Sequence, residues 1–314
     1  MRKAHPPLID TFIYTHIMTR YGETRNSLDK HNLAPKKRFG QNFLVNKNTA
    51  EAIVRAGNVS ENDTILEVGV GLGALTQPIA ERAKKVIGLE IDSGLVRFHE
   101  EEGDLPENVT LIHQDVLKTD FAELAKTCGG PLKIMANLPY SISNPFIFKL
   151  IENREYVSSA TIMLQKEVGD RLMAVPNTKD YGVPSILLQC CASIKKLMTL
   201  KPGEFHPRPK IDSVVIRIDF STQSLKSADG TPYSYRMLQK LVRTTFNQRR
   251  KTILNTLSSA SLFLESDSID KQTNKRLTEE TILEAGIQPT VRPESLSLEE
   301  FIKLVHSFTK KLNP

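Results

Sequence analysis

The sequence predicts an α/β protein in which a mostly parallel, seven-stranded sheet is followed by a small all-helical domain. Short apolar segments alternate with amphipathic segments over most of the chain, as strands and helices do in parallel sheets. Beyond residue 232 only the helical period of about 3.6 remains. The 314 residues, of which 39% are apolar and 25% charged, are enough for both parts.

Strands and helices are expected in regular succession through the first part of the chain. A short helix at 48–56 leads in, and after it each strand is followed by a helix that returns the chain across the sheet. The expected strands are 64–68, 86–91, 109–113, 133–136 and 160–164, and the helices that follow them are 74–84, 93–101, 121–126, 145–151 and 166–173. Helices are therefore predicted to cover both faces of the sheet.

Turn-forming residues mark the sheet edge and the start of the helical region. After a helix at 184–191, strands at 193–200 and 213–220 are expected to form an antiparallel hairpin at the edge of the sheet. The polar residues 221–232 are interpreted as a linker, and residues 1–34 as a flexible extension in which Met18 is an alternative start. The predicted domains are thus 35–220 and 233–314, the second with helices at 235–246, 250–257, 279–285 and 298–312.

Positive charge is concentrated at two places in the chain. Lysine and arginine exceed aspartate and glutamate by 42 to 36, which gives a net charge of +6. One cluster is Lys36-Lys37-Arg38, and the other is Arg249-Arg250-Lys251 on a predicted helix. Such clusters favour a polyanionic partner, although a solvated surface also explains each of them.

The sequence gives no indication of membrane insertion or metal binding. No segment approaches the run of about 20 apolar residues that spans a bilayer, and the apolar piece at 8–18 lacks a small-residue cleavage site. A cytoplasmic protein without a membrane partner is therefore expected. Cys128, Cys190 and Cys191 lack metal-ligand spacing and are expected to be buried thiols, so no metal site is predicted.

A glycine-rich loop follows the first strand of the predicted sheet. Strand 64–68 contains Glu67 and runs into Gly69-Val-Gly71-Leu-Gly73, where glycine lets the backbone turn sharply and exposes amides at a helix N-terminus. Glu90 stands 21 residues after Gly69, at the end of the second strand, where a carboxylate accepts hydrogen bonds from ribose hydroxyls. Both features fit NAD as well as S-adenosylmethionine, so they predict an adenosine-type cofactor without choosing between the two.

Two further strand ends carry side chains that narrow the chemistry. Asp115 follows strand 109–113, where it can contact an adenine amino group or simply cap a helix. Asn137-Leu138-Pro139-Tyr140 follows the next strand. A base amino group is a poor nucleophile because its lone pair is delocalised, so methylation needs acceptors such as the Asn137 side-chain oxygen to orient it. Pro139 restricts Leu138 to an extended backbone, and Tyr140 offers a face for an extruded base.

Asn137–Tyr140 resembles the catalytic motif of the amino-methyltransferases that act on nucleic-acid bases, and its form is similar to that of the KsgA family of ribosomal RNA adenine dimethyltransferases. The resemblance runs from about residue 33 to the C-terminus. Lys37–Leu44 matches the family's N-terminal cofactor motif, Phe205–Val214 the segment that covers the target base, and Phe246–Ile253 the RNA-facing helix. The implied fold is the Rossmann-like class I methyltransferase fold, with an S-adenosylmethionine-binding catalytic domain at 35–220 and an RNA-binding domain at 233–314.

The resemblance also implies a reaction and a role for each motif. A monomeric enzyme would dimethylate N6 of two adjacent adenosines in the 3′-terminal hairpin of 16S rRNA, within the pre-30S particle of the small ribosomal subunit. Asn42 and Leu44 would touch the methionine moiety, and Phe205 would stack opposite Tyr140. The implied catalytic residues are Asn137, Leu138, Pro139, Tyr140 and Phe205; the cofactor-binding residues are Asn42, Leu44, Glu67, Gly69, Gly71, Glu90, Asp115 and Asn137; and the RNA-binding residues are Lys36, Lys37, Arg38, Arg249, Arg250 and Lys251.

Three other functions fit parts of the pattern. A nicotinamide oxidoreductase would share the glycine loop but leaves Asn137–Tyr140 and the Phe205 segment unexplained. A large-subunit RNA methyltransferase that confers antibiotic resistance would share the fold but typically has isoleucine where Leu138 stands. A non-catalytic ribosome-assembly factor would keep the fold as an RNA-binding platform, which the intact set of cofactor residues disfavours.

Overall fold

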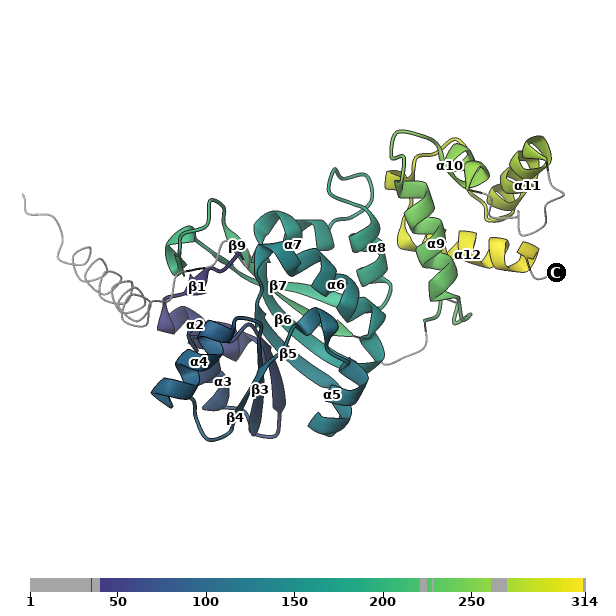
Figure 1. The fold of residues 1–314 in the computed structure, drawn as a ribbon. Helices are drawn as coiled ribbons and strands as arrows, with labels where there is room; N and C mark the ends of the chain where they lie inside the picture. The colour runs from purple at the N-terminus through teal and green to yellow at the C-terminus, as the bar shows by residue number, and fades with distance from the viewer. Residues whose placement is uncertain (1–34, 36–39, 221–224, 228, 261–269, 313–314) are drawn as a thin grey trace, which may run out of the picture. The chain divides into compact units, whose positions relative to one another are not determined.

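The computed structural model describes residues 35, 40–220, 225–227, 229–260 and 270–312, and Figure 1 shows the fold. The predicted extension 1–34 and the cluster Lys36-Lys37-Arg38 lie outside the described residues. Contacts divide the chain into two compact units. The first comprises the residues up to Gly169 together with Lys195–Asp219, and the second comprises Asp170–Ile194 and the chain from Phe220 onward. Residues 170–194, which the sequence suggested as part of the first domain, therefore pack with the helical one.

A seven-stranded sheet forms the centre of the first unit as the structure describes it. The strands run in the order β4-β3-β2-β5-β6-β9-β7. β4, β3, β2, β5 and β6 are parallel, and β9 is antiparallel to β6. The predicted mostly parallel sheet with an antiparallel edge is confirmed. The strands are β2 Thr64–Val68, β3 Lys85–Glu90, β4 Val109–His113, β5 Leu132–Asn137, β6 Val157–Gln165, β7 Ala192–Leu200 and β9 Ser213–Phe220.

Helices follow the strands because side chains at their ends satisfy the free backbone groups. The Asn46, Asp92 and Asp120 side chains accept hydrogen bonds from the first turns of α2, α4 and α5, and α4 and α5 both end at a glycine in the left-handed conformation. α2 packs on α3, α3 and α4 pack on β3, and α5 packs on β5. The helices of this unit are α2 Lys47–Ala56, α3 Thr76–Ala80, α4 Ser93–Glu102, α5 Phe121–Cys128 and α6 Ser143–Glu152, and α7 Lys166–Leu172 crosses from this unit into the second.

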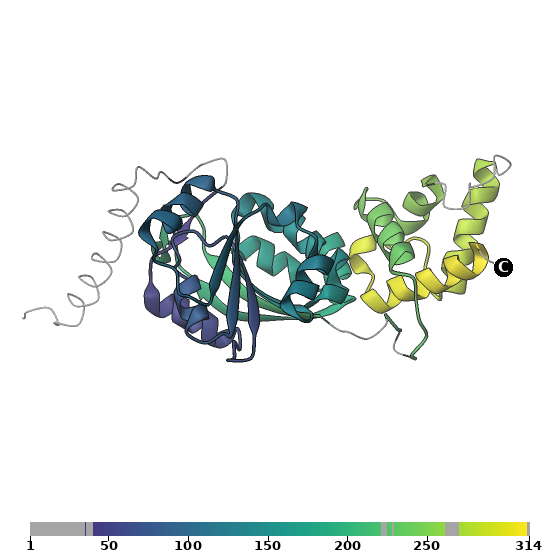
Figure 2. The same ribbon diagram turned by 60° about the horizontal axis from the view of Figure 1, so that its bottom comes forward.

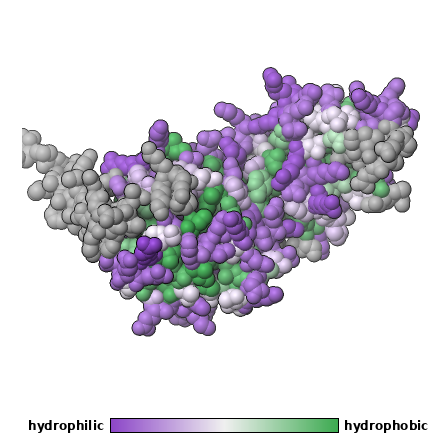
Figure 3. Space-filling model, in the orientation of Figure 1, coloured by the Kyte–Doolittle hydropathy of each residue, from purple (hydrophilic) through white to green (hydrophobic). Residues whose placement is uncertain are grey.

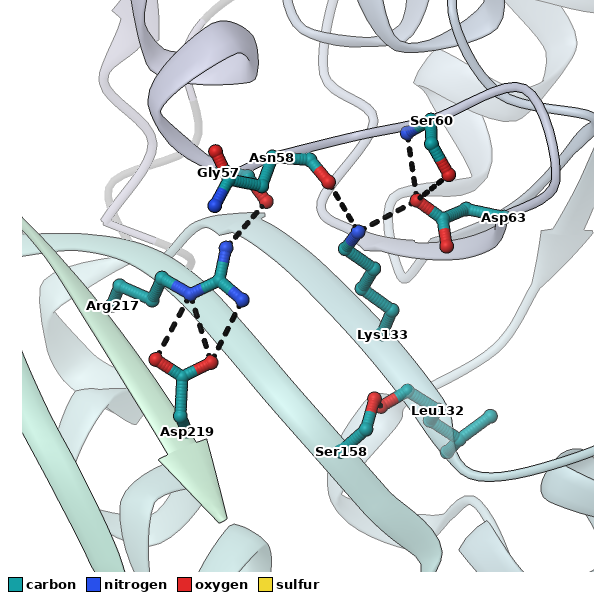
Figure 4. A network of polar contacts seen from close by, with 9 residues as sticks. All are labelled: Gly57, Asn58, Ser60, Asp63, Leu132, Lys133, Ser158, Arg217 and Asp219. Carbon is teal, nitrogen blue, oxygen red and sulfur yellow. Dashed lines mark hydrogen bonds and ion pairs between the residues drawn. The ribbon is translucent and has the colours of Figure 1, made fainter.

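A polar network lies at the end of the sheet where the parallel strands begin (Figure 4). Lys133, at the start of β5, donates to the Asn58 carbonyl and to Asp63, 2.6 Å away, and the Ser60 amide and hydroxyl also donate to Asp63. Beside them, Arg217 of β9 donates to the Gly57 carbonyl at 2.8 Å. The network connects the turn after α2 to the sheet at the amino-terminal ends of the parallel strands, and the site lies at their carboxyl ends.

The second unit, as described, is helical. α9 Tyr235–Phe246 packs on α8 Val183–Gln189, α10 Ile253–Ser259 and α12 Leu298–Leu312, and α11 Lys271–Glu284 packs on α10 and α12. Figures 1 and 2 show α9 in green beside α12 in yellow. The Tyr181 hydroxyl donates to the Leu296 carbonyl at 2.9 Å, which attaches the segment before α8 to this unit. The core side chains here include Leu238, Leu241, Phe301, Leu304 and Phe308.

Three predicted helices differ from the structure by more than two residues at one end. The helix expected at 74–84 is only Thr76–Ala80, because the chain turns back after it and the Lys84 amide donates to the Asp63 carbonyl. The helix expected at 250–257 begins at Ile253, since the Thr252 side chain caps it. The helix expected at 279–285 is the longer α11, whose buried side chains are mostly polar and therefore give no apolar period.

Candidate active site

A cavity lies at the carboxyl ends of the parallel strands, where ligands bind in open α/β sheets. The segments that follow β2, β3, β4 and β5 meet there, and the segment before β1 Phe43–Leu44 completes the wall. Much of the lining is apolar, and Figure 3 shows green apolar surface among the purple polar surface of the protein. The lining residues are Gln41, Asn42, Phe43, Val68, Gly69, Gly71, Leu89, Glu90, Ile91, Leu95, Gln114, Asp115, Val116, Asn137, Leu138, Pro139, Ser141 and Ile142.

The glycine loop has a conformation that side chains disfavour. Gly69 and Gly71 have φ angles of +78° and +61°, in the left-handed region that glycine adopts at least cost. A Cβ on Gly71 would also stand 3.3 Å from Cδ1 of Phe43. Bare backbone at this point leaves room for a ligand against the loop, as the sequence predicted.

Glu90 is a buried carboxylate, 4% exposed, at the end of β3. Its Oε2 accepts from the Gly71 amide at 3.0 Å and its Oε1 from the Asp92 amide at 2.9 Å. Burial raises the pKa of Glu90, and these hydrogen bonds lower it by less. Each oxygen keeps a further lone pair, so Glu90 can still accept from the two hydroxyls of a ribose.

Glu67 lies behind the cavity wall and is not part of it. Its side chain is fully buried, and neither carboxyl oxygen has a hydrogen-bond partner in the described structure. Burial raises the pKa of Glu67 to about 8; the neighbouring Thr76 hydroxyl lowers it, and Glu90 raises it further. At neutral pH this carboxyl group therefore carries a proton.

Asp115 both caps a helix and lines the cavity, so the two interpretations of the sequence are compatible. Its Oδ1 accepts from the Leu117 amide at 2.9 Å, at the start of the 3₁₀ helix η2 Val116–Lys118. Its remaining acceptor positions are available at the cavity wall. The cap fixes the direction of the side chain.

Asn137 is oriented by the segment before β1. Its Nδ2 donates to the Asn42 carbonyl at 2.9 Å, and because a carbonyl only accepts, this bond identifies which end of the amide is the nitrogen. The Oδ1 atom is thereby left as an acceptor. The Leu138 amide donates to the Met163 carbonyl, and the Pro139 carbonyl accepts from the Ile142 amide. Within the described part of the chain, no hydrogen bond reaches the Leu138 carbonyl.

Tyr140 stands beside the cavity and is half-buried. Its hydroxyl lies 3.0 Å from Ser213 Oγ, at the start of β9. Burial raises the pKa of Tyr140, against a smaller lowering by Ser213. Gly40 lies close to the residue that follows the motif, since a Cβ on Gly40 would stand 3.6 Å from Ser141 Oγ.

Like Glu67, the predicted site residues Phe205 and Leu44 are buried and do not line the cavity. Phe205 is 1% exposed and belongs to the hydrophobic core, where β8 Phe205–His206 pairs with β1; its stacking opposite Tyr140 stays a prediction. Leu44 also points into this core, and its neighbour Phe43 lines the cavity instead. Successive side chains of a strand face opposite sides, so a difference of one residue decides which of the two reaches the ligand.

Several lining residues were not in the predicted set. Gln41 and Phe43 lie inside the N-terminal motif but carry no chemistry that marks them, and Gln114 precedes the predicted Asp115. Ile91 follows Glu90 and is 42% exposed, which is unusual for isoleucine. From the sequence, Ile91 and Gln114 could be predicted as cavity residues only because they are adjacent to the strand-end acids Glu90 and Asp115.

The predicted RNA-binding residues that the structure describes belong to the second unit. Arg249, Arg250 and Lys251 are exposed and lie in the turn between α9 and α10, rather than on a helix. Arg249 donates to the Lys179 carbonyl at 2.8 Å and stands over the Phe246 ring at 5.8 Å. Within this cluster, Arg250 and Lys251 therefore have fewer described side-chain contacts than Arg249.

The cavity fits a nucleoside cofactor by its own features. A glycine cradle, a buried acid with spare acceptor positions and apolar residues for a ring occur together in its wall. Next to them stands an amide acceptor that would face an amino group. Among the described residues, no group of three or more His, Cys, Asp or Glu side chains could hold a metal ion. No helix of the described structure is both long and apolar enough to cross a bilayer.

The Rossmann-like fold and this site define an enzyme of the methyltransferase class. Residues 32–286 match the family model described as ribosomal RNA adenine dimethylase, and the chain belongs to that family. It is 62% identical, over 94% of its length and 99% of the relative's, to ribosomal RNA small subunit methyltransferase A of Desulfotalea psychrophila. The protein of the same name from Alkaliphilus oremlandii is 40% identical over 92% of this chain and 97% of its own.

Solved structures show the same architecture. A dimethyladenosine transferase from Plasmodium falciparum has a TM-score of 0.69 and 26% identity, covering 86% of this chain and 98% of its own. The 23S rRNA methyltransferase ErmE has a TM-score of 0.60 with 20% identity over 85% of this chain and all of its own, a likeness of fold alone. Membership of a methyltransferase family rules out the oxidoreductase alternative.

Proposed function

We propose that this enzyme uses S-adenosylmethionine to dimethylate N6 of two adjacent adenosines in the 3′-terminal hairpin of small-subunit 16S rRNA. The observation that carries the proposal is the orientation of Asn137, whose amide nitrogen is held by Asn42 so that Oδ1 is left as an acceptor. The small-subunit substrate is supported by the names of the relatives at 62% and 40% identity. A ribosomal RNA substrate places the proposed activity in the cytoplasm, and we propose a monomer acting on the pre-30S particle.

The cofactor would lie across the carboxyl ends of β2, β3 and β4. Glu90 would accept from the ribose hydroxyls, and Asp115 from the adenine amino group, with Val116 beside the ring. Gly69 and Gly71 would let the backbone approach, and Asn42 and Phe43 would bound the methionine end. Glu67 would support the loop from behind. When bound, S-adenosylmethionine supplies an electrophilic methyl group on its sulfonium.

The chain's own contribution to the chemistry is to orient the amino group. Asn137 Oδ1 and the Leu138 carbonyl would accept the two N6 hydrogens and direct the nitrogen lone pair toward the methyl group. Pro139 holds the backbone extended at this point, with φ −54° and ψ 135°. Tyr140, positioned by Ser213, offers the face on which the extruded base would stack.

The test compares Asn137→Ala with Asn108→Ala. Asn108 also uses its amide to donate to backbone carbonyls, those of Ala80 and Ala83, but outside the cavity. We expect Asn137→Ala to slow methyl transfer by about 10²–10³-fold, because the amino group loses an oriented acceptor, and Asn108→Ala to retain the rate of the folded enzyme. Transfer of tritiated methyl groups to undermethylated small subunits measures the rate.

Primer extension on the same RNA locates the product, since dimethylated adenines block the polymerase. Stops at two adjacent adenosines near the 3′ end support the proposal. Incorporation into large subunits in preference to small ones would contradict the substrate, and an Asn137→Ala enzyme of normal rate would contradict the assigned role of Asn137.

A further inference from the structure

A buried histidine contacts the glycine loop from outside the cavity. His99 lies on α4, is 2% exposed and is not among the residues that line the cavity. Its Nε2 lies 3.0 Å from the Gly71 carbonyl oxygen, and its Nδ1 lies 2.7 Å from Asp104 Oδ1. Gly73 also stands close to the ring, since a Cβ there would be 3.6 Å from His99 Cε1.

The two partners determine how the ring is used. A backbone carbonyl only accepts, so the Gly71 contact is a hydrogen bond when Nε2 carries the hydrogen. The Asp104 carboxylate also only accepts, so both contacts are hydrogen bonds when each ring nitrogen carries a hydrogen, as in the imidazolium form, and Asp104 then fixes the plane of the ring. Asp104 is itself held, because its carbonyl accepts from the Gln77 side chain of α3 at 2.9 Å. His99 therefore links the turn after α4 to the glycine loop.

Gly71 is thus held on both sides. Its N–H donates to Glu90 and its carbonyl accepts from His99. Because glycine has the widest choice of backbone conformations, a glycine loop that lacks such bonds must lose much conformational entropy when a ligand orders it. The two hydrogen bonds remove that freedom before any ligand arrives.

We propose that His99 is a positioning residue for the cofactor loop: its Nε2–H holds the Gly71 carbonyl, and Asp104 holds the ring. The inference rests on the proposed function, since the loop lines the cavity assigned to S-adenosylmethionine. A loop ordered in advance binds its ligand more tightly. His99 therefore raises cofactor affinity without touching the cofactor, and its loss increases KM for S-adenosylmethionine more than it decreases kcat.

Two conservative variants separate this role from simple filling of space. In His99→Gln the amide nitrogen stands near the place of Nε2 and can still donate to Gly71, whereas in His99→Asn it stands near Nδ1 and reaches only toward Asp104. Calorimetry with S-adenosylhomocysteine should give a dissociation constant within about threefold of wild type for His99→Gln and about tenfold weaker for His99→Asn. KM should follow the same order, with kcat at saturating cofactor nearly unchanged.

Hydrogen exchange on the cofactor-free protein gives a second readout. The Gly71 and Gly73 amides should exchange faster in His99→Asn than in His99→Gln. His306→Asn, in the second unit, is the control and should change neither exchange nor affinity. Equal affinities and equal exchange in the two His99 variants would overturn the proposal. If the exchange rates differ but the wild type does not bind S-adenosylhomocysteine, His99 still holds the loop and the proposed cofactor is wrong.

Discussion

Glu67 is fully buried behind the site, and neither of its carboxyl oxygens has a hydrogen-bond partner in the described structure. An ionised carboxylate in such a place costs much free energy, so the group keeps its proton instead. Glu90 is also buried, but its surroundings differ, because two backbone amides donate hydrogen bonds to its carboxylate. The same residue type is therefore neutral behind the loop at one position, and at the other we propose that it accepts ribose hydroxyls.

This difference predicts a pH dependence of stability. The pKa of Glu67 is about 8 in the folded protein against an ordinary 4.5. Between these values the folded chain binds more protons than the unfolded chain, so the free energy of unfolding decreases as pH rises. Glu67→Gln is always neutral and lacks this loss. Urea unfolding at pH 5, 6.5 and 8 should show the variant gaining stability relative to wild type with each step, and a pH-independent difference would contradict the burial argument.

Phe43 and Phe205 are two aromatic residues whose roles the structure separates. Phe43 lines the cavity, whereas Phe205 is 1% exposed within the core. Phe205→Ala should lower the free energy of unfolding by about 3–5 kcal/mol because it leaves a cavity. Phe43→Ala should weaken S-adenosylhomocysteine binding, with a smaller loss of stability. Thermal unfolding and calorimetry on both variants check this, and the reverse assignment of the two effects would refute it.

At the scale of elements, α6 connects the catalytic motif to the wall that carries Asp115. The helix begins at Ser143, after the 3₁₀ helix η3 Tyr140–Ile142 that contains the last residue of the motif. Farther along it, Lys149 donates to the Thr119 carbonyl at 2.7 Å and to the Leu117 carbonyl at 3.3 Å, and its ammonium stands 4.8 Å from the centre of the Phe121 ring. Burial lowers the pKa of Lys149 although acidic neighbours raise it. The helix thus holds the middle and the end of the turn that Asp115 begins.

Lys149→Met tests this connection, because methionine keeps the apolar stem and loses the donor. We expect S-adenosylhomocysteine affinity to fall about 3- to 10-fold, since two carbonyls lose a charged partner and the turn loosens. Lys126→Met on α5 is the matched control: its side chain is 78% exposed and pairs only with Glu123. Equal affinities in the two variants would show that α6 does not support the cofactor wall.

At the scale of the whole molecule, the two units divide the proposed work. The first carries the sheet and the cavity, and the second carries the exposed cluster Arg249-Arg250-Lys251. Arg249 already contacts Lys179 and Phe246 within its unit. The charges available for phosphate groups are therefore those of Arg250 and Lys251, and we propose that they bind ribosomal RNA.

Replacing Arg250 and Lys251 by glutamate should weaken binding to small subunits and flatten its salt dependence. Each lost phosphate contact should reduce the slope of log affinity against log salt by about 0.9, if the value for duplex DNA holds for RNA. Lys271→Glu with Lys275→Glu, exposed on α11 of the same unit, reverses the same number of charges. Identical slopes for the two double variants would show that general charge, and not this cluster, attracts the RNA.

The sequence by itself determined the parts of this protein that depend on local pattern. Parallel strands are mostly apolar, so β2 and β4 were predicted with the bounds they have, although β4 at the edge of the sheet is partly exposed. Acids and glycines at strand ends could also be predicted as cavity residues, because few structural roles need Glu90 or Gly71 at those positions. Together with the Asn137–Tyr140 motif, they led to the family that the comparison confirms.

Only the tertiary structure decided which side of each segment faces the cavity. β1 has two residues, and its pairing with β8 directs Leu44 into the core and Phe43 to the cavity. The same pairing buries Phe205. The His99 contact with Gly71 joins residues 28 positions apart, and the Asn137 contact with Asn42 joins residues 95 apart. Such contacts depend on how the elements pack in space, and no period or spacing along the chain encodes them.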